Sequence, residues 1–223
     1  MFPIADENFS VERPYITYSL IIINIIIYAI NFFTADSLNM IFAFVPKNFM
    51  EGIEPWTIIT HQFMHGGWGH LLGNMWFLII FGDNIEATIG KFKYLFFYLL
   101  CGMIAALSHM AFNLDSIIPT VGASGAISGV LGAYIILYPK NKISTIIPFG
   151  FIRIYKVEAL YYLVIWFVIQ LLFSFTDPYG GVAYMAHLGG FFGGVLLIKL
   201  FVVKKKKTKN DSYYTWENQY DNT

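Results

Sequence analysis

Six apolar segments, each close to the length of a membrane-spanning helix, set the strongest limit on how this chain of 223 residues can fold. A helix needs about 20 mostly apolar residues to cross a hydrocarbon core about 30 Å thick. Only 13% of the residues are charged, far below the share in a typical soluble domain. The sequence therefore predicts an all-α polytopic membrane protein with six transmembrane helices. The predicted helices cover 15–33, 69–87, 92–112, 124–138, 159–175 and 183–203.

The segments outside these helices divide the chain into three regions. Residues 1–14 are polar, and no signal-peptide cleavage site follows the first apolar run, so that run is expected to remain as an anchor. Residues 15–203 are the predicted helical core, in which the loop 139–158 is interpreted as partly interfacial. Residues 204–223 are a basic and polar tail, expected to be disordered and to contact anionic membrane lipids. The single cysteine, Cys101, excludes a disulfide framework and a thiolate metal cluster.

The basic residues determine the predicted orientation. With a cytoplasmic N-terminus and six spans, all of the 14 basic residues except Lys47 and Lys199 fall in cytoplasmic segments. Positive residues concentrate on the cytoplasmic side of membrane proteins, so this orientation is favoured over its inverse. The expected location is the plasma membrane, with both termini in the cytoplasm. The long, aromatic loop 34–68 is expected to lie outside, against the membrane interface.

The fourth predicted helix is too short to cross a bilayer alone. As a helix, residues 124–138 extend about 22 Å, at 1.5 Å per residue. The outer end must therefore begin below the membrane surface, where the loop 113–123 dips in to meet it. Non-helical backbone at this depth is tolerated only when it is buried in protein or faces a water-filled cavity. The short, sunken helix predicts a hydrated recess that opens to the outside, with Ser124 at its floor.

Polar side chains on three predicted helices share the depth of this recess. Ser124 opens the fourth helix, and His187 lies near the outer start of the sixth. His70 and Asn74 are four residues apart and share one face of the second helix. Ionisable residues within membrane spans mark functional sites by default. A serine and a histidine can act as nucleophile and base, while His70, the Asn74 amide and the Ser124 N–H can donate hydrogen bonds to an oxyanion.

Glycines near these residues indicate how the helices approach one another. Gly122 would let the chain approach a substrate closely. Small residues at every fourth position let membrane helices pack closely, and such faces on the fourth and sixth helices would hold Ser124 and His187 within hydrogen-bond reach. The small residues are Gly125, Gly129 and Ala133 on the fourth helix, and Gly189, Gly190, Gly193 and Gly194 on the sixth.

The same residues also have structural interpretations. Taken alone, a serine among small residues in a membrane helix is more often a packing residue than a nucleophile. His61, His65 and His70 lie close together in sequence, but "HQFMH" lacks the glutamate of a zinc-protease motif, so no metal site is predicted. His109 has no partner that the sequence identifies and is interpreted as structural.

Three motifs follow one another along the chain: "HQFMHGGWGHLLGNMWFL", "GASGAISGVLGAY" and "AHLGGFFGG". In this order, they resemble those of the rhomboid intramembrane serine proteases. The resemblance covers residues 15–203 and implies a rhomboid-like six-helix bundle. It implies a Ser–His dyad, here Ser124 and His187, without a cofactor. It further implies that His70 and Asn74 help to form the oxyanion hole, and that the substrates are single-pass membrane proteins cleaved within or just outside their membrane segment.

The resemblance also implies a route by which the substrate enters, although this sequence departs from the family pattern at two positions. Entry is expected near the fifth helix and the outer loop 176–182, whose glycines favour mobility. Many relatives carry Trp-Arg in the first outer loop, whereas Trp56 is followed here by Thr57. Some relatives stack a tyrosine on the catalytic histidine from one turn after the nucleophile, where this chain has Ser128. The orienting partner of His187 is therefore unassigned by the sequence.

The sequence thus predicts an intramembrane serine endopeptidase with no cofactor and no nucleic acid partner. Two alternatives stay open. One is a proteolytically inactive rhomboid-like protein that binds membrane helices; such proteins have usually lost the serine or the histidine, and this chain keeps both. The other is a small transporter or channel, which would need a continuous polar path, whereas the inner halves of the fourth and sixth helices are apolar. No oligomeric state is predicted.

Overall fold

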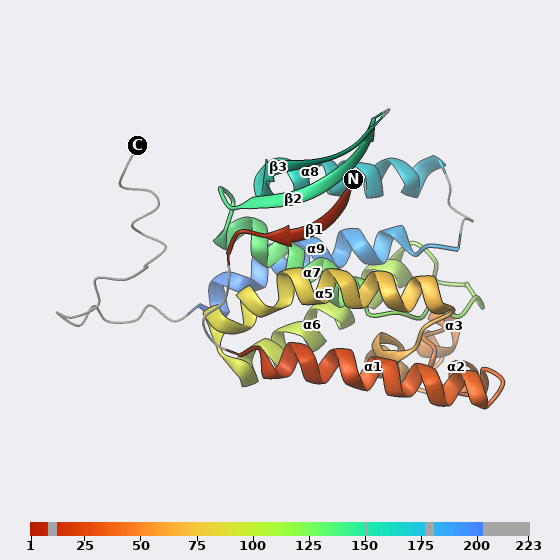
Figure 1. Ribbon diagram of the computed structural model, residues 1–223. Helices are drawn as coiled ribbons and strands as arrows, with labels where there is room; N and C mark the ends of the chain where they lie inside the picture. The colour runs from red at the N-terminus through yellow and green to blue at the C-terminus, as the bar shows by residue number, and fades with distance from the viewer. Residues whose placement is uncertain (9–12, 150, 177–180, 203–223) are drawn as a thin grey trace.

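Long helices that run alternately in opposite directions dominate the computed structural model (Figure 1). The structure describes residues 1–8, 13–149, 151–176 and 181–202. The long helices are α1 (Tyr15–Phe33), α5 (Trp68–Ile89), α6 (Lys91–Ala111), α7 (Ser124–Leu137), α8 (Ala159–Thr176) and α9 (Tyr184–Phe201). Between α1 and α5 lie the short helices α2 (Ser37–Phe42), α3 (Pro46–Met50) and α4 (Thr57–Thr60) and the 3₁₀ helix η1 (His61–Phe63). The predicted tail 204–223, and residues 177–180 of the predicted entry loop, lie outside the described residues.

The helices are those of a multi-pass membrane protein. Over the described residues, four are both long and apolar enough to cross a membrane: α1, α6, α8 and α9. Helix α5 is longer, at 22 residues, but polar residues interrupt its apolar surface. Helix α7 has 14 residues and so extends only about 21 Å. Apolar side chains such as Ile26 on α1 and Leu172 on α8 are more than half exposed, as expected for a surface that faces lipid.

Helix α7 lies at the centre of the bundle. Every residue from Gly125 to Tyr134 is buried. On α9, Gly190 and Gly194 pack against the backbone of Gly125 and Gly129, so closely that a Cβ on either α9 residue would overlap with an α7 carbonyl. Membrane helices lack a hydrophobic drive to associate and depend instead on such close contact between small residues. The glycines therefore fix the position of α9 relative to α7.

A three-stranded antiparallel sheet is the main departure from the all-α prediction. Strand β1 (Phe2–Asp6) pairs with β2 (Lys142–Phe149), which pairs with β3 (Phe151–Glu158). The segment 139–158, interpreted from the sequence as a partly interfacial loop, therefore contains a β-hairpin. A two-stranded hairpin alone is only marginally stable, and the third strand of this sheet, β1, lies at the far N-terminal end of the chain. Local hydropathy carries no information about such a pairing.

Strand β1 attaches the sheet to the helices. The Trp76 indole N–H on α5 donates to the Pro3 carbonyl at 2.7 Å, and the Trp76 ring stacks on Phe2. At the end of the strand, the Asp6 carboxylate accepts hydrogen bonds from the Tyr134 hydroxyl at 2.6 Å and the Asn84 amide at 2.8 Å. Burial raises the pKa of the Asp6 carboxyl to about 6. The N-terminal residues thus pack on the bundle through both apolar and polar contacts.

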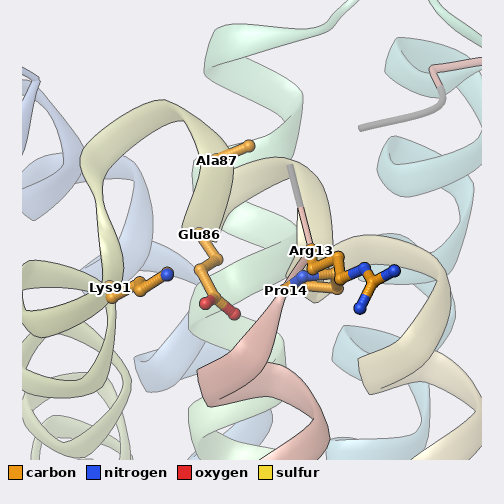
Figure 2. A pocket seen from close by; sticks show the side chains of 5 residues that line it. All are labelled: Arg13, Pro14, Glu86, Ala87 and Lys91. Atoms are coloured by element: carbon orange, nitrogen blue, oxygen red, sulfur yellow. The ribbon is translucent and has the colours of Figure 1, made fainter. Parts of the chain in front are cut away.

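A buried carboxylate caps the start of α1. Glu86 on α5 accepts hydrogen bonds from the backbone N–H groups of Ile16 and Thr17 at 2.9 and 2.8 Å, and from the Thr17 hydroxyl at 2.9 Å. The first N–H groups of a helix lack partners within the helix and carry a partial positive charge, so a carboxylate there is stabilising. Figure 2 shows Glu86 between Arg13 and Lys91. The hollow around it, about 10 Å³, has room for no more than a water molecule.

Candidate active site

Ser124 is the first residue of α7, and the loop before it is firmly held. Gly122 has a φ of +128°, which residues with a side chain rarely adopt. Its N–H donates to the His61 carbonyl at 2.9 Å. Earlier in the loop, Thr120 and Phe44 exchange backbone hydrogen bonds of 2.8 and 2.9 Å. These hydrogen bonds hold Thr120 and Gly122 in place and set where α7 begins.

Two buried, neutral histidines lie near Ser124: His61 contacts the loop before α7, and His65 contacts Asn74 on α5. The His61 ring N–H at Nδ1 donates to the Thr57 carbonyl at 2.8 Å. Burial lowers the pKa of His61 to about 4 and that of His65 to about 3, because a protonated ring in either buried position would lack the solvation that water gives to a charge. Both rings are therefore uncharged at neutral pH and act through hydrogen bonds rather than through charge.

His187 on α9 faces Ser124. Its Nε2 lies 2.8 Å from the Ser124 Oγ, and its Nδ1 lies 2.9 Å from the Oε1 of Gln170 on α8. An amide oxygen can only accept a hydrogen bond, so Nδ1 carries the ring proton and donates it. Nε2 then has a free lone pair and accepts from the Ser124 hydroxyl. This is the tautomer that a general base requires.

His70 and Asn74, on α5, line the same cavity as Ser124. The His70 ring sits against Gly122, where an added Cβ would come within 2.6 Å of its Nε2 and 3.6 Å of the Ser124 Oγ. The Asn74 amide donates to the His65 Nε2 at 3.0 Å. An amide nitrogen has two hydrogens, so Asn74 keeps a second donor for a ligand in the site.

These side chains line one cavity of about 250 Å³. The cavity lies between α5, α7, α8 and α9, so four helices contribute to it. One part of its lining is polar: His70, Asn74, Ser124, Ser128, Gln170 and His187. Another part is apolar: Phe77, Ile127, Leu131 and Trp166. Convergent polar groups beside an apolar surface are the usual form of a ligand site. Here they could hold a peptide carbonyl against Ser124 and an apolar side chain beside it.

The glycines of the sequence prediction divide between two helix contacts. Gly190 packs on Gly125 of α7, whereas Gly189 packs on Ser108 of α6. Gly125 and Gly129 contact α6 as well as α9. Of the two small faces of α9, the one with Gly190 and Gly194 therefore packs on α7, whereas the one with Gly189 and Gly193 packs on α6.

Sequence reasoning missed two residues of the site. Gln170 was not considered, although it is the only amide or charged residue in α8, and an isolated amide in an apolar membrane helix is a signal of a buried contact. The sequence suggests His65 only as a metal ligand and not as a hydrogen-bond partner of Asn74. Ser128 does not reach His187, because its hydroxyl donates to the Ser124 carbonyl at 2.7 Å. Within the described part of the chain, no group of three His, Cys, Asp or Glu side chains is placed to hold a metal ion.

Comparison with known proteins shows which family this chain resembles. The family model described as "Rhomboid domain" matches residues 52–204. A Bacillus subtilis protein named "Putative rhomboid protease YdcA" is 31% identical over 157 residues, which are 69% of this chain and 71% of that protein. Two Arabidopsis thaliana proteins are similar over a smaller share of their own length. RHOMBOID-like protein 4 is 30% identical over 78% of this chain and 39% of its own. RHOMBOID-like protein 1 is 32% identical over 68% of this chain and 36% of its own.

Proposed function

The chain belongs to the rhomboid family, and from this we propose that it is an intramembrane serine endopeptidase that cleaves the transmembrane segments of single-pass membrane proteins. The observation that carries the proposal is the 2.8 Å contact between the His187 Nε2 and the Ser124 Oγ, with the ring in the tautomer of a base. A serine that serves only in helix packing has no need of an imidazole aimed at its hydroxyl.

In the proposed reaction, Ser124 attacks the peptide carbonyl while His187 takes the hydroxyl proton. The negative charge that develops on the carbonyl oxygen is stabilised by the Ser124 N–H, the free N–H of Asn74 and the His70 ring. His187 then gives its proton to the leaving amine, the C–N bond breaks, and an acyl-enzyme remains. A water molecule, deprotonated by His187, attacks this ester, releases the new carboxyl terminus and restores Ser124. No cofactor enters these steps.

We further propose that the protein crosses the plasma membrane six times, with α5 and α7 as spans in addition to the four apolar helices. Two features support this arrangement. Both helices pack within the bundle formed by the other four (Figure 1). A cytoplasmic N-terminus places all of the 14 basic residues except Lys47 and Lys199 in cytoplasmic segments. The start of the short α7 then lies below the outer surface, and the cavity opens to the outside, where water can reach it.

The test is cleavage of candidate single-pass membrane proteins by the purified protein in liposomes. Ser124→Ala and His187→Ala should each lower the rate by about 10³-fold or more, because each removes a group that takes part in bond making. Both variants should keep the thermal stability of the unsubstituted protein. Ser19→Ala on α1 serves as the control, since that hydroxyl bonds, among the described residues, only to the Tyr15 carbonyl of its own helix.

Two outcomes would contradict the proposal. Equal cleavage by the unsubstituted protein and by Ser124→Ala would exclude Ser124 as the nucleophile. Binding of substrate without cleavage, together with no labelling of Ser124 by a fluorophosphonate probe, would instead support the alternative of an inactive rhomboid-like protein that binds membrane helices.

A further inference from the structure

Gln170 is the only described side chain that forms a hydrogen bond with the Nδ1 of His187. The Gln170 Oε1 lies 2.9 Å from that nitrogen. The rings of Trp166 and Tyr184 also flank the imidazole, at centroid distances of 6.3 and 6.4 Å, but their contacts are those of aromatic packing. Gln170 itself is half-buried and lines the cavity that contains Ser124.

This contact decides which nitrogen of His187 can act as a base. A neutral imidazole holds one proton, on either Nδ1 or Nε2. With the proton on Nε2, the ring would have no lone pair to offer the Ser124 hydroxyl. An acceptor beside Nδ1 stabilises the productive tautomer and also fixes the ring orientation, as second partners of functional histidines commonly do. Among the described residues, no carboxylate contacts His187 to perform this role.

We propose that Gln170 is a positioning residue for the catalytic histidine: its side-chain carbonyl selects and holds the His187 tautomer that can deprotonate Ser124. The inference rests on the proposed serine protease function and adds to it a residue from a third helix, α8. The acceptor is neutral, so it orients the ring without the strong stabilisation of the imidazolium that a carboxylate would give.

The test compares the rates at which a fluorophosphonate probe labels Ser124 in three variants and in the unsubstituted protein, over a range of pH. Gln170→Leu removes the acceptor and should lower the labelling rate at saturating probe by about tenfold, the effect of losing one hydrogen bond. Gln170→Glu keeps an acceptor and should retain labelling, but its rate should rise only at higher pH, because a carboxylate stabilises the protonated ring. Ser174→Ala, on the same helix, should match the unsubstituted protein, since its hydroxyl bonds to the Leu171 carbonyl.

The outcomes separate the inference from the function on which it rests. If the unsubstituted protein labels at Ser124 but Gln170→Leu labels at the same rate, the inference is overturned and the proposed function stands. If Gln170→Leu and Gln170→Glu lose labelling and thermal stability together, Gln170 is a packing residue, and the inference is again overturned. If the unsubstituted protein does not label, the proposed function and the inference both fail.

Discussion

Asn74 is a buried amide that uses one N–H group to hold its position and keeps the other for a hydrogen bond to a ligand. One of its N–H groups is bonded to the His65 Nε2, and the residue is only 8% exposed. The neutral state of His65 is essential, because a protonated ring would have no lone pair for the amide. His65 therefore holds Asn74 in one orientation at the wall of the cavity, and in the proposed reaction its second N–H is an oxyanion donor.

Asn74→Ala should lower the rate of substrate cleavage by about 10²–10³, the usual effect of losing one oxyanion donor, and should leave substrate binding nearly unchanged. Cleavage kinetics in liposomes measure both quantities. Asn113→Ala is a suitable control, because the Asn113 amide bonds to the His109 carbonyl within its own segment. An unchanged cleavage rate in Asn74→Ala would remove this amide from the oxyanion hole.

Single residues differ in how far the sequence could predict them. Ser124, His187, His70 and Asn74 could be named because each is a polar residue in an apolar helix near the same end of the bundle. The contact of Gln170 with His187 could not be predicted, because it joins two helices, and no local sequence pattern predicts how these helices are rotated relative to each other. The role of His65 as a support for Asn74 was missed because His65 lies in the non-helical segment before α5, whose backbone path no helical period predicts.

Among the elements, the contact between α7 and α9 has the least tolerance for change. At Gly194 an added Cβ would overlap with the backbone of Gly129, and backbone cannot move aside as the end of a flexible side chain can. The two helices would have to separate. Since Ser124 and His187 lie on these two helices, any separation also lengthens the contact between them.

Gly194→Ala should therefore lower the stability by about 1–3 kcal/mol and reduce proteolysis at the same time. Thermal unfolding in detergent measures the first effect and cleavage kinetics the second. Gly73→Ala on α5 is the matched control for stability, because an added Cβ there meets nothing within 4 Å. If both variants unfold at the same temperature, the close packing of α7 on α9 does not limit stability.

The sheet adds a pH-dependent attachment between the N-terminal strand and the bundle. Burial raises the pKa of Asp6 from 3.8 to about 6, so the folded state binds this proton more tightly than the unfolded state does. The contribution of Asp6 to stability is thus most favourable below about pH 4, declines as the pH rises to about 6, and is constant above that.

Asp6→Asn should remove this dependence. The difference in melting temperature between Asp6→Asn and the unsubstituted protein should grow in favour of the variant as the pH rises from about 4 to about 6, and then stay level. Glu7→Gln provides a comparison of opposite sign, because the hydrogen bond from Lys156 lowers the pKa of Glu7. A difference that does not change with pH would show that Asp6 does not titrate in this range.

The buried polar groups of the whole molecule gather near the two ends of the bundle. The cavity opens near the starts of α5, α7 and α9, whereas the Glu86 contact with α1 and the Asp6 cluster lie toward the other end. In the proposed orientation, the first end faces the outside of the cell and the second the cytoplasm. Water would then reach the dyad from outside, while close packing of α7 against α6 and α9 seals the inner half.

Reporter fusions test this orientation. Alkaline phosphatase, which is active only outside the cytoplasm, should be active when fused in the 34–68 or 113–123 segments. A fluorescent protein that folds only in the cytoplasm should be fluorescent when fused near residue 90, in the 139–158 segment or after residue 204. The reverse pattern would place Ser124 on the cytoplasmic side and contradict the proposed topology.

The sequence by itself determined the apolar helices, the predicted orientation and the identity of the serine and the histidine. Hydropathy, charge and helical period are sums over neighbouring residues, so they can be evaluated without knowing how distant segments meet. The β1–β2 pairing, the division of the α9 glycines between α6 and α7, and the Gln170–His187 and His65–Asn74 bonds depended on the tertiary structure. Each of these depends on the rotation and depth of one element relative to another, which is fixed only when backbones pack to within atomic contact.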